Sequence, residues 1–277
     1  MNLTAQIWID LATSDLQSSR LLHDSGHFRT SYFLFQQATE KANKAFALLA
    51  DIIKEDELKK FSHNTINIYK ETSKKQAKEI NALVKILEQH PNNSEHKIFA
   101  KTNFIKYHET LSQGVSFMNN LWNYDLVKIS LSDLNFFLRE LKKVRTTKIK
   151  IPNTYEKKFD KIMLGIADWA GQFGTEDAIN TKKEYLSLIA NRDQAKEYCD
   201  LIVNQLFPMV IDIAFVNLTL YFCAVITVQH SSLTRYPEKG KNPELIYTKR
   251  LPLIQKQKQF MDLLEDSLVR FKNLNKR

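Results

Sequence analysis

The sequence predicts an all-α protein. Glycine and proline are scarce, with six of each in 277 residues, whereas sheet proteins need such residues at the turns between short strands. Apolar residues instead recur every three or four positions along the long segments, which is the spacing of one helix face. The chain is 43% hydrophobic and 26% charged, a composition typical of soluble globular proteins, and it is long enough for one large domain or two modest ones.

Two helices are predicted at the N-terminus. The first spans residues 3–25 and ends at Gly26, because glycine commonly follows a helix C-terminus. Glu40 precedes Lys44 by four residues in the second helix, the favourable order for an ion pair on a helix surface. Together with Lys41 they are expected to form a solvated face. The other face is a continuous apolar stripe formed by Phe28, Tyr32, Phe35, Ala38, Ala42, Phe46 and Leu49.

The remaining helices follow from the same periodicity and from capping residues. Asn153 and Glu156 have the spacing of a capping box. Gly174 is predicted to stop one helix, and Thr175 to cap the next. Lys148–Pro152 is the most extended passage and is predicted to be a connector. The predicted helices cover residues 63–89, 94–123, 125–144, 154–173, 176–206, 209–228 and 252–273.

The helix of residues 209–228 is nearly long and apolar enough to cross a bilayer. Asp212 and Asn217 lie inside it, and a charge at mid-membrane is costly, so a buried core helix is favoured over a membrane span. The N-terminus lacks a basic stretch followed by an apolar core, and no secretory signal is expected. With only Cys199 and Cys223, neither disulfides nor a cysteine metal site are expected. We expect a cytoplasmic protein with no membrane partner and no cofactor or metal.

The chain is basic, with a formal charge of +9 and a pI near 9.3. Such an excess attracts phosphate-rich partners or an anionic surface, although it can also serve only solubility. The densest basic run covers residues 142–150. Lys143, Arg145 and Lys148 in this run are candidate contacts to nucleic acid, and the alternative is that they complement a helix dipole.

Two separated passages resemble the HEPN family of small helical bundles. The first is Asp10–Ala47, where a helix, a turn at Gly26 and the run Gln36-Gln37-Ala38-x-Glu40-Lys41-Ala42 follow one another, with Phe61-Ser62-His63 downstream. The second is His230–Glu244, which contains Thr234-Arg235-Tyr236-Pro237 before a final long helix. The resemblance implies an up-and-down helical bundle with a helical insertion. Residues 1–75 and 201–277 are expected to form the bundle, and residues 76–200 an insertion or an elaboration of it.

The resemblance also implies which residues to examine for function. Nucleases of this family are metal-independent and carry an arginine followed by a histidine after four to six residues, and Arg20 with His27 is the one match of that spacing here. The arginine would stabilise phosphate charge and the histidine would move a proton. His63, His230, Arg235 and Tyr236 are further candidates for binding nucleotide or RNA, although each of them could equally be a structural residue.

We therefore expect a HEPN-like module that binds nucleotide or RNA without cleaving it, in a defence or toxin–antitoxin system. A metal-independent endoribonuclease is the first alternative, and a helical scaffold for another protein is the second. By family analogy the chain would form a homodimer and could meet a separate nucleotidyltransferase-type partner. No glycine-rich phosphate loop, HExxH helix or Gly-x-Ser-x-Gly elbow supports another enzyme class.

Overall fold

The computed structural model confirms an all-α fold: every regular element within the described residues is a helix. By contacts, the chain forms two compact units. Unit 1 comprises Met1–Thr72, Phe117–Thr147 and Ile211–Arg277, and unit 2 comprises Ser73–Ser116 and Lys148–Val210. The structure describes residues 2–61, 64–89, 100–147, 155–237, 240 and 242–276.

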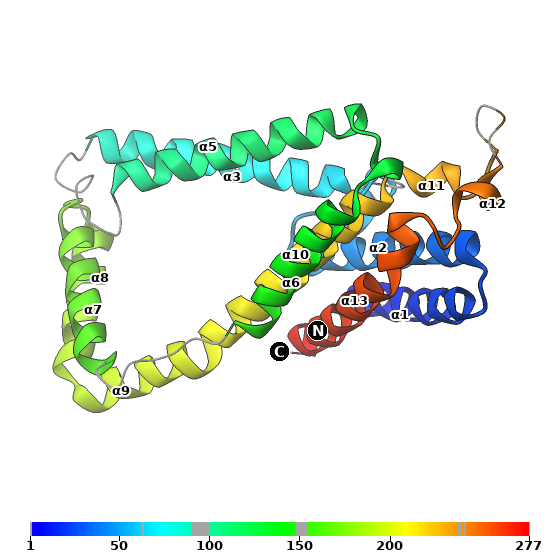
Figure 1. Cartoon of the computed structure of the whole chain (residues 1–277). Coiled ribbons are helices and arrows are strands. Elements are labelled where there is room, and N and C mark those ends of the chain that lie inside the picture. The colour runs from blue at the N-terminus through cyan, green and yellow to red at the C-terminus, as the bar shows by residue number, and fades with distance from the viewer. Residues whose placement is uncertain are drawn as a thin grey trace. The chain divides into compact units, whose positions relative to one another are not determined.

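Unit 1 begins with a helical hairpin of α1 (Leu3–Asp24) and α2 (Phe28–Leu49), which pack side by side (Figure 1). Gly26 turns the chain between them with φ +82°, a left-handed conformation that glycine adopts without steric cost. This confirms the predicted stop. The hairpin buries the predicted apolar stripe of α2, from which Tyr32, Phe35, Ala38 and Ala42 are fully buried.

The last helix closes this core. The helix α13 (Pro252–Lys276) packs against α1 and α2, and the two chain ends lie together, where the N–H of Asn2 donates to Asn275 Oδ1 at 2.9 Å (Figure 1). One continuous cluster joins these three helices to α6 (Leu131–Thr146) and to α10 (Phe207–Thr227). Its largest fully buried members are Ile9, Tyr32, Phe35, Leu134, Leu141, Phe215, Leu220, Phe260 and Phe271.

The polar side of α2 differs from the prediction of a solvated face. Glu40 and Lys44 are only 7% and 8% exposed, and Lys44 Nζ lies 2.7 Å from Glu40 Oε1, which confirms the predicted ion pair but places it in the interior. Beside it, Asn43 is buried and accepts a hydrogen bond from the hydroxyl of Tyr69 at 2.6 Å. Tyr69 belongs to α3 (Ile66–Gln89), so α2 is covered on more than one side.

The apolar helix α10 is part of a longer helical stretch that has to be assessed as a membrane span. One helix, Arg192–Thr227, is long and apolar enough to cross a bilayer by length and composition, which is weak evidence because core helices pass the same test. From Phe215 onward, α10 supplies residues to the core of unit 1. Asp212 pairs with Arg270 of α13 at 2.9 Å, and the Arg270 guanidinium also lies 4.5 Å from the Phe215 ring centroid. The charge inside the apolar stretch thus has a partner within the bundle.

Short elements complete unit 1. They connect the long helices and position the loop that follows α10. A small second cluster of buried residues, which includes Ile53 and Ile68, packs against Leu58 and Phe61 of η1. Their bounds are η1 (Glu55–Phe61), η2 (Leu121–Asn123), η3 (Leu126–Lys128), α11 (His230–Leu233) and α12 (Pro243–Ile246).

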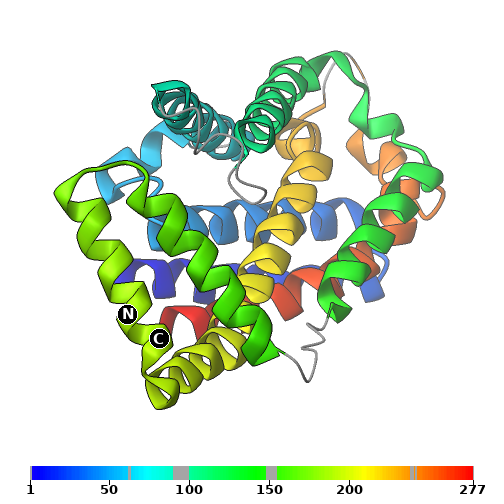
Figure 2. The ribbon, with the colours of Figure 1, turned by 90° about the vertical axis from the view of Figure 1, so that its left-hand side faces the viewer.

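Unit 2 contains the greater part of α3 and of α5 (Lys101–Asn120), and then α7 (Tyr155–Gly171) and α8 (Glu176–Ala190), which pack side by side (Figure 2). The predicted boundary between the last two is confirmed. Gly174 has φ +68°, and Thr175 Oγ1 accepts the N–H of Ala178 at 3.2 Å. The predicted capping box at Asn153 lies outside the described residues.

The prediction of one helix over residues 176–206 is wrong. The chain breaks at Asn191, whose Oδ1 accepts the N–H of Gln194 at 3.3 Å and so caps α9 (Arg192–Leu201). The π turn η4 (Ile202–Leu206) then leads directly into α10. Pro208 has no N–H to donate to the carbonyl four residues earlier, and the π turn lies immediately before it.

The boundaries of the two compact units differ from the domain boundaries expected from the sequence. Residues 117–147 were assigned to the insertion, but α6 places Leu134, Leu138 and Leu141 in the core of unit 1. These three residues are spaced by four and three, so they form one helix face. Residues 201–210 were assigned to the bundle, but they belong to unit 2.

Candidate functional site

The most promising polar site of unit 1 is a pocket of about 440 Å³ where the start of α2 meets the segment after α11. We call it the arginine pocket. Arg29 comes from the first turn of α2, and Arg235 follows α11, so two cations from opposite ends of the chain line one cavity. The full lining is Arg29, Arg235, Pro237, Gly240, Asn242, Pro243 and Glu244.

Arg29 has a structural role in this pocket. Its Nε donates to Glu244 Oε1 at 2.5 Å, and its Nη1 donates to the backbone carbonyl of Thr234 at 2.7 Å. A cation in the first turn of a helix opposes the helix dipole, and the Glu244 carboxylate compensates for that. Arg29 therefore ties both α12 and the Thr234 backbone to the start of α2.

Arg235 is held by uncharged groups. Its Nε donates to the carbonyl of Ser231 at 2.7 Å, and its Cζ lies 5.7 Å from the ring centroids of both Phe33 and Tyr236. Within the described part of the chain, no ion pair involves Arg235. One hydrogen bond and two ring contacts thus hold the guanidinium, and its charge is not neutralised by a described carboxylate.

Tyr236 lies beside this cation and is 59% exposed. The ring of Tyr236 is therefore not packed into the protein interior. A fixed guanidinium binds phosphate oxygens through its fork of N–H donors, and an exposed aromatic ring stacks on a base. The pair can hold a phosphate and an adjacent base, which are the two parts of a nucleotide.

The side chains of Arg20 and His27, the predicted catalytic pair, make no described hydrogen bond to each other. The Arg20 guanidinium points to α13, where Nη1 lies 2.6 Å from Asp262 and Nη2 lies 2.9 Å from Glu265. These carboxylates help to raise the arginine pKa against the effect of burial. His27 is exposed at the N-cap of α2, where its side chain makes no capping hydrogen bond.

His230 is a core residue. Its side chain is fully buried, Nδ1 lies 2.5 Å from the hydroxyl of Tyr247, and its ring packs edge-on against Tyr32 at 4.9 Å between centroids. Desolvation lowers the pKa of the imidazole to about 4, so it is neutral near pH 7. The prediction that His230 contacts a ligand phosphate is wrong, because a buried neutral ring neither reaches solvent nor carries charge.

Two cations of the basic run, Lys143 and Arg145 near the end of α6, are paired with carboxylates. Lys143 Nζ lies 2.9 Å from Glu140 Oε1, and Arg145 Nε lies 2.7 Å from Asp266 Oδ2. These pairs reduce the positive potential that phosphate would meet. His63 and Lys148, two further predicted contacts, lie outside the described residues.

Sequence reasoning missed Arg29. The available signal was its position, because an arginine in the first turn of a helix has to be explained by a nearby acceptor. Phe33 lies one turn further along α2. It was also missed, because only the structure places its ring beside the Arg235 guanidinium. The described residues hold no group of three or more His, Cys, Asp or Glu side chains that could bind a metal ion.

A comparison with models of protein families finds a match that includes the hairpin of α1 and α2. The model of the HEPN domain matches residues 5–128. This part of the chain is similar to a HEPN domain. The matched region runs from α1 to η3 and includes Arg29, whereas Arg235 and the helices α6, α10 and α13 lie beyond it. No curated protein matches the chain, and no solved structure matches it either.

Proposed function

We propose that this HEPN-like chain binds RNA or a nucleotide at the arginine pocket, without cleaving it, in a defence or toxin–antitoxin setting. Arg235 binds a phosphate, Tyr236 stacks on the attached base, and Arg29 holds the pocket together. The observation that carries the proposal is the Arg235 guanidinium, which is fixed by Ser231 and Phe33 and has no described carboxylate partner. An ordered cation of this kind loses little side-chain entropy when it binds phosphate.

Two further observations support the choice of ligand. The chain carries a formal charge of +9, which attracts polyphosphate chains at long range. HEPN domains are a family linked to RNA binding, RNA cleavage and defence. Binding is favoured over cleavage because the Arg20 guanidinium is engaged by Asp262 and Glu265 and makes no hydrogen bond to His27.

The experiment is a titration of fluorescent single-stranded RNA followed by anisotropy at several salt concentrations. We expect Arg235→Ala to weaken binding about ten-fold, because it removes one charge-assisted phosphate contact, and to reduce the salt slope by about one. Tyr236→Ala should weaken binding about five-fold or more with little change in the salt slope, since stacking is uncharged. Arg139→Ala is the matched control. Arg139 is exposed on α6 and pairs with Glu140, so it removes the same formal charge at another surface.

Three results would contradict the proposal. The first is RNA affinity that is equal in Arg235→Ala and Arg139→Ala, which would place the binding elsewhere. The second is the absence of salt-sensitive RNA or nucleotide binding by folded protein, which would favour a scaffold. The third is cleavage of the RNA in chelator that is lost in Arg20→Ala or His27→Ala, which would make the protein an endoribonuclease.

A further inference from the structure

The arginine pocket contains a carboxylate beside its two cations. Glu244 lines the pocket together with Arg29 and Arg235. Its Oε1 lies 2.5 Å from Arg29 Nε, and its own N–H donates to Asn242 Oδ1 at 3.0 Å. The Glu244 side chain is 61% exposed, so the carboxylate is held at the pocket and also faces solvent. A ligand that enters the pocket therefore meets a negative charge.

The described lining of the pocket carries two guanidinium groups and one carboxylate, which leaves a single uncompensated cation. Glu244 neutralises Arg29, whose Nη1 also donates to the Thr234 carbonyl at 2.7 Å. Arg235 makes no described ion pair, and its Nε donates to the Ser231 carbonyl, an uncharged partner. A ligand group with a single negative charge matches this balance, whereas a group with two charges exceeds it.

The charge of a phosphate group depends on how it is esterified. A phosphodiester inside an RNA strand carries one negative charge. A phosphate monoester, as in a free nucleotide, carries about −1.5 to −2 near pH 7. The second charge of a monoester is desolvated at a cost that only a further free cation would offset, and in this cavity of about 440 Å³ it also meets the Glu244 carboxylate. The described charges of the pocket thus favour the diester.

We propose that Glu244 makes the arginine pocket selective for phosphodiesters over phosphate monoesters. The inference rests on the proposed function, and it selects a polynucleotide strand over a free nucleotide as the ligand of that site. Arg235 binds the phosphodiester and Tyr236 stacks on the attached base, while the Glu244 carboxylate repels a second phosphate charge. Specificity often depends on such a repulsive group in addition to the attractive ones.

A purely structural role of Glu244 would give a different result on substitution. If the carboxylate served only to hold Arg29, its loss would weaken the pocket for every ligand. Selectivity by charge predicts instead that Glu244→Gln strengthens binding, and that it does so more for a monoester than for a diester. The glutamine side chain keeps an oxygen that can accept the hydrogen bond from Arg29 Nε, so this substitution removes the charge and retains the contact.

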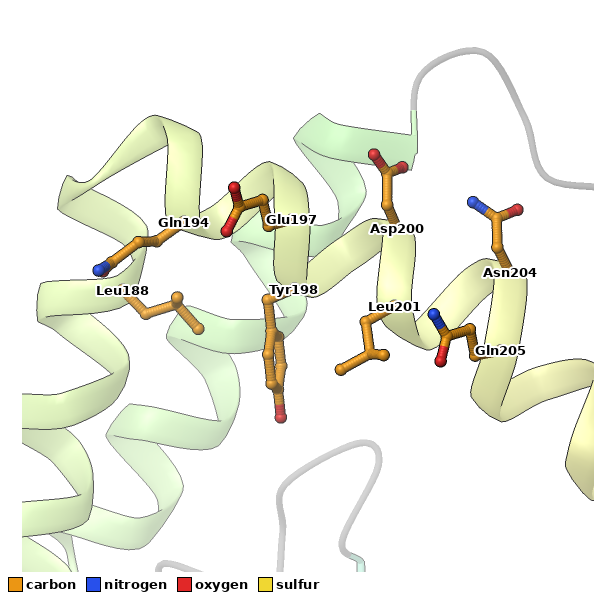
Figure 3. A pocket seen from close by; sticks show the side chains of 8 residues that line it. All are labelled: Leu188, Gln194, Glu197, Tyr198, Asp200, Leu201, Asn204 and Gln205. Atoms are coloured by element: carbon orange, nitrogen blue, oxygen red, sulfur yellow. The ribbon is translucent and has the colours of Figure 1, made fainter. Parts of the chain in front are cut away.

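A larger pocket in unit 2, about 640 Å³ in volume, is not suited to phosphate (Figure 3). Among its described lining residues are two carboxylates, those of Glu197 and Asp200, and no lysine or arginine. In Figure 3 both carboxylates project from α9 on the side opposite Tyr198. A phosphate group would be repelled there without a cation to hold it. Discrimination between phosphate esters is therefore expected at the arginine pocket.

The test compares two ligands that differ only at the phosphate: adenosine monophosphate and its methyl ester, which is a phosphodiester. Each competes with fluorescent single-stranded RNA for the full chain near pH 7, and the displacement is followed by anisotropy. Both ligands present the same base to Tyr236, so a difference between their affinities reports the phosphate alone. We expect wild type to bind the methyl ester more tightly than the monoester.

Glu244→Gln should shift the ratio of the two affinities about five-fold toward the monoester. This is the effect of one unit charge across roughly 8 Å at an effective dielectric constant of about 40. Glu265→Gln is the matched control. Glu265 is exposed and pairs with an arginine, Arg20, at 2.9 Å, but it does not line the pocket, so its substitution changes the net charge equally and should leave the ratio unaltered.

The outcomes separate this inference from the proposed function. If RNA binds through Arg235 but wild type does not prefer the methyl ester, the selectivity is overturned and the function stands. An unchanged ratio in folded Glu244→Gln, or an equal shift in Glu265→Gln, has the same meaning. The absence of RNA binding that depends on Arg235 overturns both. The wild-type comparison needs no variant, so the test stays decisive if Glu244→Gln does not fold.

Discussion

The buried Glu40–Lys44 pair on α2 allows a direct test of how this fold is stabilised. The side chains are 9% and 10% exposed, the charged atoms are 2.7 Å apart, and the Lys44 ammonium lies 5.3 Å from the ring centroid of Trp8. Lys44→Met keeps most of the side-chain length but removes the cation. The buried Glu40 carboxylate then keeps its hydrogen bond from Gln36 Nε2 at 3.3 Å but loses the Lys44 ammonium.

The expected cost follows from the asymmetry between breaking and replacing a buried pair. Loss of one partner costs about 3 kcal/mol, because a buried charge is left without its counter-charge, whereas replacement of both partners by neutral groups is nearly free. Lys44→Met should therefore lower the free energy of unfolding by about 3 kcal/mol. At about 2–4 °C per kcal/mol for a unit of this size, the midpoint should fall by about 6–12 °C. Glu40→Gln combined with Lys44→Met should recover most of this loss.

The assay is thermal and urea unfolding followed by far-UV circular dichroism. Lys143→Met is the matched control, since Lys143 pairs with Glu140 on an exposed helix face at 2.9 Å, and exposed pairs contribute under about 1 kcal/mol. The reasoning is refuted if Lys44→Met costs no more than Lys143→Met, or if the double variant is less stable than Lys44→Met alone.

Two further predictions concern buried chemistry and backbone conformation. Burial lowers the pKa of His230 from 6.5 to about 4, so the unfolded chain binds more protons between these values. Its stabilisation is complete above pH 6.5 and is lost as pH falls toward 4, by about 1.4 kcal/mol per pH unit. Urea midpoints from pH 7 to 4.5 should fall less steeply in His230→Gln, and equal slopes would contradict this. Gly26→Ala should cost about 1–2 kcal/mol because φ is +82° there. In contrast, Gly114→Ala, in α5 with no atom within 4 Å of the new Cβ, should stabilise by about 0.5–1 kcal/mol. Thermal midpoints that move in the same direction for both glycine variants would refute the conformational argument.

The helices of the hairpin were predictable because their information is local. The apolar stripe of α2 and the glycine turn at Gly26 specify α1 and α2 without reference to the rest of the chain. The break at Asn191 was not predictable in the same way, because the flanking residues suit a helix on both sides. Asn191 ends α8 and caps α9 through its own side chain, a local signal that apolar periodicity alone does not register.

The burial of Glu40 and Lys44 also required tertiary information. Periodicity assigns one face of a helix to the core and the other to solvent, and α2 violates that rule because it is a central helix. It contacts α1 and α13 through its apolar stripe, while Tyr69 of α3 bonds Asn43 on another side. A helix enclosed on several sides carries buried charges only as pairs.

The residues of the candidate site were likewise predicted only in part from the sequence. The sequence singled out Arg235 and Tyr236 through their resemblance to a family motif, but it also singled out His230, which the fold buries. The position of Arg29 in the first turn of a helix indicated that it needs an acceptor, but not which one, because the Thr234 carbonyl and Glu244 lie more than two hundred residues away in sequence. Only tertiary contacts decide which cations face solvent and which are neutralised.

The matched HEPN region therefore cannot account for the fold or the site by itself. Residues 5–128 supply Tyr32 and Phe35, yet both are buried in a cluster that also contains Phe215 of α10 and Phe260 of α13. Without those helices the apolar stripe of α2 would face water. The arginine pocket has the same dependence, since Arg29 comes from the matched region and Arg235 from outside it. Folding of the C-terminal helices onto the hairpin is thus the step that creates both the core and the phosphate-binding geometry that we propose.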